Sequence, residues 1–90
     1  MSALISIDST PDRAVVSWTG AASGSASAQA MVWAPQALTA GSYSFTVTLD
    51  GRTLATVAST ALADGHEYAI PAPSVWGPSG GQALTLREVY

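Results

Sequence analysis

The chain has 90 residues, the size of one small domain, and only 10% of them are charged, where roughly 25% is usual for soluble domains. It has no cysteine, which excludes disulfide bonds and thiolate metal sites and leaves a single apolar core as the source of stability. The net charge of −3, without any lysine, argues against binding to nucleic acid or to an anionic membrane. We therefore expect one domain over residues 1–90.

Two further features of the sequence bear on its origin and location. Lysine and asparagine are both absent, and both have AT-rich codons, so a GC-rich bacterial or bacteriophage genome is expected. No apolar stretch approaches the ~20 residues of a membrane-spanning helix, and no basic segment followed by an apolar block opens the chain. We therefore expect a protein that is used in the cytoplasm or carried out as part of an assembly.

The first part of the chain predicts short strands with turns and one small-residue loop between them. A first strand is expected over Leu4–Ile7 and a second over Arg13–Trp18, where apolar residues alternate. Gly20–Ser27 contains only Gly, Ala and Ser and predicts a loop. Gln29–Trp33 predicts a further strand.

The clearest pattern is a hairpin in the middle of the chain. Apolar and hydroxyl side chains alternate along Tyr43–Leu49, which is typical of a strand with one buried face. Asp50-Gly51 follows, a favoured pair for a two-residue type I′ turn, and Arg52–Ala58 predicts the returning strand.

The last part of the chain predicts two more strands. Glu67–Ile70 forms one, Trp76–Gly81 is a loop, and Ala83–Val89 is the final strand. Seven short strands at nearly even spacing predict an all-β fold, a small β-sandwich of antiparallel strands.

Residues Phe45–Val57, followed by Leu62–Ile70, resemble the central part of fibronectin type III domains, which are Ig-like sandwiches. In that family a strand ending in Asp-Gly precedes its partner strand and then a Leu-x-x-Gly-x-x-Tyr corner. The resemblance implies that the hydroxyl of Tyr68 bonds to backbone near Leu62, which would fill the core.

A tryptophan adds to the resemblance. Trp33 is similar to the core tryptophan on the second strand of the family, and Trp18 is the alternative for that role. The likeness covers roughly residues 30–70 and implies no ligand site, because the Arg-Gly-Asp sequence that binds integrins is absent.

Few residues could carry catalysis or bind a metal. His66 is the only histidine and lies in an expected turn, where we predict an exposed side chain. Asp64, His66 and Glu67 are the densest group of possible ligands, but the zinc and calcium patterns are missing. We predict no catalytic, cofactor or metal site, and no enzyme activity.

The candidates for partner binding are two loops, Gly20–Ser27 and Trp76–Gly81, and two terminal strands that could be sheet edges, Leu4–Ile7 and Ala83–Val89. Trp76, with Gly77 and Pro78, lies in a glycine-rich loop that is either a structural connection or a contact loop anchored by the indole. Leu4 and Ile5 belong to a strand without protective charge, which we predict to be an edge open to pairing with another chain.

Together these features favour a non-enzymatic structural or interaction module. We expect an accessory, decoration-type virion protein of a tailed bacteriophage, which binds capsid proteins as a homo-oligomer or symmetric array. The alternative is an extracellular bacterial carbohydrate-binding module or adhesin domain, with Trp76 as the platform on which a sugar stacks.

Overall fold

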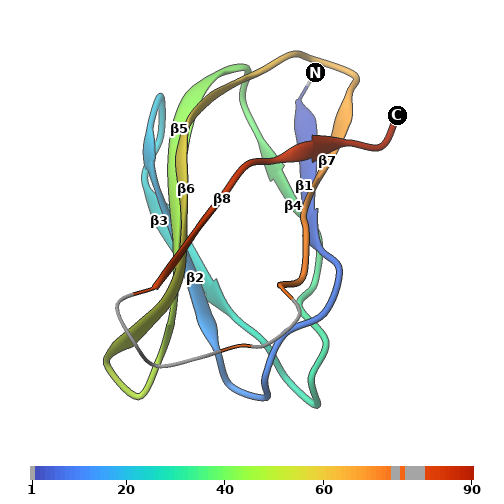
Figure 1. Ribbon diagram of the computed structural model, residues 1–90. Coiled ribbons are helices and arrows are strands. Elements are labelled where there is room, and N and C mark those ends of the chain that lie inside the picture. Colours follow the sequence, from blue (N-terminus) through green and yellow to red (C-terminus); the bar gives the residue numbers. More distant parts are fainter. Residues whose placement is uncertain (1, 74–75, 77–80) are drawn as a thin grey trace.

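Two β-sheets face each other in the structure, a computed structural model that describes residues 2–73, 76 and 81–90 (Figure 1). The four-stranded sheet has the order β4-β1-β7-β9, and the five-stranded sheet has the order β3-β2-β5-β6-β8. The predicted all-β sandwich is therefore confirmed. Among the residues that the structure describes, no helix is long and apolar enough to cross a membrane. The strands are β1 (Ala3–Ile7), β2 (Val15–Gly20), β3 (Gly24–Ser27), β4 (Gln36–Leu38), β5 (Gly41–Leu49), β6 (Arg52–Leu62), β7 (Glu67–Ile70), β8 (Gln82–Leu84) and β9 (Arg87–Glu88).

The predicted central hairpin is confirmed as β5 and β6. Leu49 pairs with Arg52, and both turn residues have positive φ, 50° at Asp50 and 80° at Gly51. These are the left-handed values that a type I′ turn requires, and the Asp-Gly pair tolerates them at little cost. Phe45 and Val47 point into the core, as the alternation predicts.

Strand β6 runs four residues past its predicted end at Ala58 and contains two irregularities. The pairing of β5 with β6 shifts between Tyr43 and Phe45 and again between Val47 and Thr48. An extra residue at each shift turns the next side chain to the other face. Leu54, Ala55 and Val57 are consequently all buried, although a regular strand could not place all three on one face.

The first strand is not an edge, so that prediction is wrong. β1 lies between β4, which is antiparallel to it, and β7, which is parallel to it. The Leu4 N–H donates to the carbonyl of His66 over 3.1 Å. β6 and β8 form a second parallel pair, so the expectation of antiparallel strands throughout is also wrong.

Two predictions between Gly20 and Trp33 are wrong as well. The expected loop contains the strand β3, in which the small Gly24 lies under the ring of Trp18. The expected strand over Gln29–Trp33 is instead a tight turn, closed by hydrogen bonds between Gln29 and Val32 in both directions, 2.8 and 3.0 Å.

The expected final strand Ala83–Val89 is divided between the two sheets. β8 pairs with β6 in one sheet, and β9 pairs with β7 in the other. Leu84 and Leu86 pack against the core from this crossing segment. The C-terminal segment therefore closes one side of the sandwich, which Figure 1 shows in red.

The core lies between the sheets and contains both candidate tryptophans. Trp18 and Trp33 are buried and meet edge to face, with ring centroids 6.5 Å apart. Trp18 lies on β2, whereas Trp33 lies outside the strands. The Nε1 of Trp33 donates to the carbonyl of Ala26 over 3.0 Å.

The predicted corner hydrogen bond is confirmed. The N–H of Ala63 donates to the hydroxyl of Tyr68 over 3.1 Å, and Leu62 is buried. Gly65 has a φ of 79° at the third position of the turn that the His66 N–H closes on the Ala63 carbonyl. That is the position at which a type II turn requires a left-handed residue, which glycine supplies.

Candidate interaction surface

Trp76 is not an exposed platform. It is half-buried and packs against the core, and its Nε1 is buried without a hydrogen-bond partner among the described residues. Gly77 and Pro78, the other candidates in this loop, lie outside the described residues. Because Trp18 and Trp33 are buried too, none of the three tryptophans supplies the exposed ring that the sugar-binding alternative requires.

Leu4 and Ile5 do not offer a free strand edge. Ile5 is fully buried in the core, and Leu4 is half-buried on a strand with neighbours on both sides. The main chain of β1 is thus already paired within its own sheet. Neither residue can add a strand from a partner while the sandwich stays folded.

His66 lies on the surface, as predicted. Its Nδ1 pairs with the carboxylate of Glu88, and its ring stacks near Tyr68 with centroids 6.4 Å apart. Within residues 2–73, 76 and 81–90, no three His, Asp or Glu side chains gather as metal ligands, and no pocket is present. Asp64, His66 and Glu67 therefore do not gather as metal ligands in the described part of the chain.

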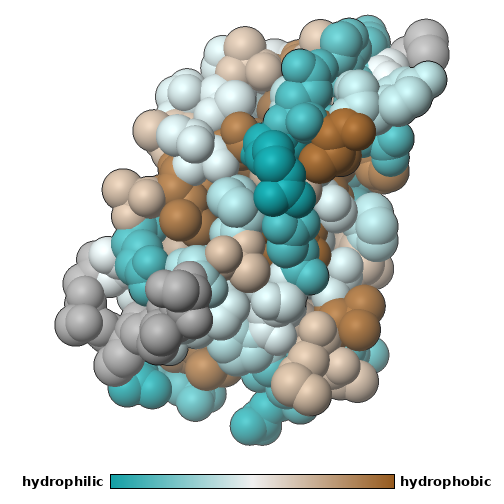
Figure 2. Space-filling model, turned by 45° about the vertical axis from the view of Figure 1, so that its right-hand side comes forward, coloured by the Kyte–Doolittle hydropathy of each residue, from teal (hydrophilic) through white to brown (hydrophobic). Residues whose placement is uncertain are grey.

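Charged side chains gather where the C-terminal segment closes the sandwich. Arg87 Nη2 donates to both carboxylate oxygens of Asp8, over 2.9 and 2.8 Å, and Glu88 meets His66. These two exposed ion pairs lie where β9 pairs with β7. Each contributes little to the free energy of unfolding, because water surrounds it. Figure 2 shows hydrophilic side chains gathered in a band down this side of the molecule.

One long continuous segment of the sandwich contains no charged residue. Residues 14–49 contain no Asp, Glu, Lys, Arg or His, and they form β2, β3, β4 and β5. In the described part of the chain, β3 ends the five-stranded sheet and β4 ends the four-stranded sheet. We call residues 14–49 the neutral segment.

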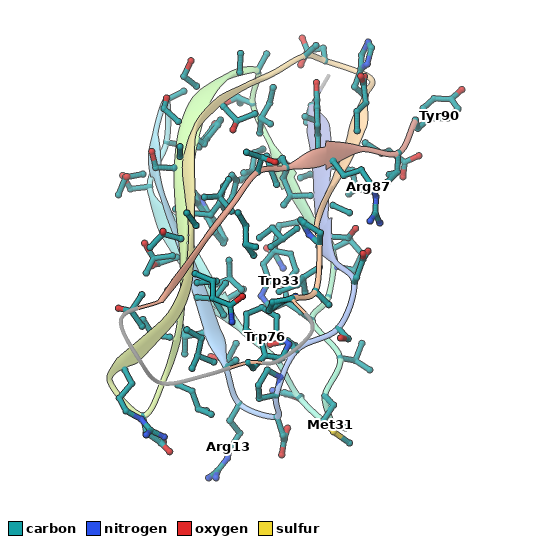
Figure 3. All side chains as sticks on the ribbon, viewed as in Figure 1. Arg13, Met31, Trp33, Trp76, Arg87 and Tyr90 are labelled. Atoms are coloured by element: carbon teal, nitrogen blue, oxygen red, sulfur yellow. The ribbon has the colours of Figure 1, made fainter. Side chains whose placement is uncertain are left out.

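The neutral segment displays two large apolar side chains on a tight turn. Met31 and Val32 have exposed fractions of 66% and 67%, the highest for any large aliphatic residue described. Figure 3 shows Met31 at one end of the molecule, pointing away from the core. We call Gln29–Val32 the apolar turn.

The backbone of the apolar turn is strained and firmly held. Ala30 and Met31 have φ values of 54° and 62°, which cost non-glycine residues on the order of 1 kcal/mol each. Asp12 Oδ1 accepts a hydrogen bond of 2.7 Å from the Ala30 N–H. Ala28 bonds to Arg13 and Ala14, which ties the base of the turn to the chain before β2.

The sequence contained a signal for this surface. The run without charge is visible in the sequence, and Ala30-Met31 is an unusual pair in a two-residue turn that favours Asn-Gly. The turn was missed because Gln29–Trp33 also fits a strand pattern. The free edge of β3 was missed because a run of Gly, Ala and Ser has no apolar alternation.

Comparisons of the chain with protein families, with curated proteins and with solved structures found no match.

Proposed function

We propose that this chain is a non-enzymatic interaction module that binds a larger protein assembly through the apolar turn. The observation that supports this is the pair Met31 and Val32, exposed on a backbone that is strained and yet fixed by hydrogen bonds. Strained conformations of this kind persist where the surrounding structure holds them, and they cluster at binding sites.

The chemistry of the turn favours a protein partner with an apolar recess. A rigid turn loses little backbone entropy on binding, so the burial of its two apolar side chains is not offset by the cost of ordering a loop. The neutral segment that contains the turn carries no charge, and the carboxylate of Asp12 at the base of the turn accepts a hydrogen bond from the Ala30 N–H. Nucleic acid and anionic membranes are not proposed as partners, because the net charge is −3.

The setting that we propose is the virion of a tailed bacteriophage, where the module would decorate the capsid. What supports this setting is composition: a small β-sandwich that is poor in charge and lacks lysine and asparagine, the residues with AT-rich codons.

We also infer that the sandwich is a distant variant of the fibronectin type III fold. The corner supports this, since Tyr68, Gly65 and Leu62 take the positions that the resemblance implies. The inference concerns architecture and assigns no ligand.

The proposal is tested by co-sedimentation of the tagged chain with purified virions from the strain that carries its gene. We expect the wild-type chain to travel with the particles and Val32→Ser to lower the bound fraction about tenfold, because an exposed apolar anchor is lost. The matched control is Val89→Ser, which changes a half-exposed valine near the charged side and should bind normally.

Absence of the wild-type chain from the particles would contradict the virion setting, and equal binding by Val32→Ser would contradict the role of the turn. A glycan that the chain binds while it ignores the particles would favour the carbohydrate-binding alternative.

A further inference from the structure

We propose that a second copy of this chain pairs with the outer edge of β3, so that two five-stranded sheets join into one continuous sheet about a two-fold axis. This rests on the proposed function as an interaction module and names one partner of the neutral segment. The apolar turn remains the contact with the larger assembly.

The geometry of β3 suits pairing with itself. β3 is bonded to β2 along one side, with a continuous register from Gly24 opposite Trp18 to Ser27 opposite Val15. Alternate residues of such a strand turn their N–H and C=O groups outward, where they lack a ladder partner in the described structure. An antiparallel pair of identical edges is self-complementary, as a two-fold interface requires.

Apart from its shortness, β3 lacks the features that normally protect a sheet edge. Protected edges are short, carry lysine, other charges or proline, or contain a bulge. β3 has the sequence Gly-Ser-Ala-Ser, and no register shift interrupts its pairing with β2. Its side chains are small, so a second strand can approach closely.

β4, the edge strand of the four-stranded sheet on the same side of the sandwich, is a poorer candidate for pairing. β4 has three residues and directly follows Pro35, which has no N–H to donate. Leu38 in β4 turns into the core. β3 is longer, and three of its four residues are exposed.

The distribution of charge favours contact between two copies at this edge. Copies with a net charge of −3 repel each other wherever their carboxylates meet. All six carboxylate residues lie outside the neutral segment, so a pair formed along β3 places none of them in the new strand ladder. Contact along β9 would instead bring Asp8 and Glu88 toward their own copies.

Sedimentation equilibrium over a concentration series up to about 1 mM tests this pairing, because a weak strand pair is expected near that dissociation constant. The wild-type chain should show a concentration-dependent dimer. Ser25→Lys should raise the dissociation constant at least about fivefold, because a two-fold axis brings the two ammonium groups together. Ser27→Lys is the second variant, in case the first is poorly folded.

Thr56→Lys is the matched control, since Thr56 is also exposed in the same sheet but lies on β6, which has strands on both sides. It should dimerise like the wild-type chain. A wild-type chain that stays monomeric, or equal weakening by Thr56→Lys and the β3 variants, would overturn the pairing. A monomer that still binds virions through Val32 would overturn only this inference and leave the proposed function intact.

Discussion

Two tyrosines use their hydroxyl groups to fix the backbone at the ends of strands. The Tyr68 hydroxyl accepts from the Ala63 N–H over 3.1 Å, and the Tyr43 hydroxyl donates to the Thr39 carbonyl over 2.8 Å. Both rings are buried, so their oxygens and these backbone groups need partners inside the protein. Of the two bonds, the sequence predicted that of Tyr68, because a corner motif surrounds it.

Tyr68→Phe should lower the free energy of unfolding by about 1 kcal/mol, because the Ala63 N–H loses its partner in a partly buried place. Urea denaturation measures the change. Tyr90→Phe, at a tyrosine that is 77% exposed, is the control and should be neutral. An equally neutral Tyr68→Phe would mean that the corner contributes nothing to stability.

Gly24→Ala should destabilise the fold although Gly24 lies on an exposed edge strand. A β-carbon at this position would lie 2.9 Å from Cζ2 of Trp18, a ring that is buried and cannot turn away. Such overpacking costs about 1–3 kcal/mol in urea denaturation. Ser25→Ala next to it should change little, and a loss below about 0.5 kcal/mol for Gly24→Ala would contradict this packing.

Elements with a regular local pattern could be predicted from the sequence, and elements set by distant contacts could not. The hairpin of β5 and β6 was predictable, since seven alternating residues and Asp-Gly determine strand and turn locally. The position of β1 between β4 and β7 was not, because a parallel neighbour more than sixty residues away leaves no local pattern. β3 was not predictable either, because its contacts are with distant rings: Gly24 lies against Trp18, and the Ala26 carbonyl accepts from Trp33 Nε1.

The same distinction applies to the candidate surface. Leu4 and Ile5 were predicted to bind a partner from the absence of charge alone, but β1 is covered on both sides. Charge-poor sequence predicts either a core strand or a free edge, and only the strand order distinguishes them. In the described structure β3, and not β1, lies at the end of its sheet.

Replacement of Ala30-Met31 by Asn-Gly should stabilise the folded chain, because these residues adopt left-handed φ more readily. We expect a gain of about 1 kcal/mol or more in urea denaturation, together with loss of binding to the assembly. The control is Met31→Ser, which removes the apolar side chain without relief of the backbone strain. A double variant that is no more stable than Met31→Ser would show that the turn stores no strain.

At the scale of the whole molecule, the two sides of the sandwich are built differently. The C-terminal segment closes one side, held by Arg87 with Asp8 and by Glu88 with His66. The other side ends in β3 and β4, within a segment that has no charge. This asymmetry favours association at the open, neutral side and opposes it at the charged side.

Amide hydrogen exchange at about 10 μM and about 1 mM tests most directly whether the molecule associates through its neutral side. The account predicts that residues Gly24–Ser27 exchange more slowly at the higher concentration, while β9 exchanges at the same rate in both samples. Slower exchange in β8 or β9, with no change in β3, would contradict it.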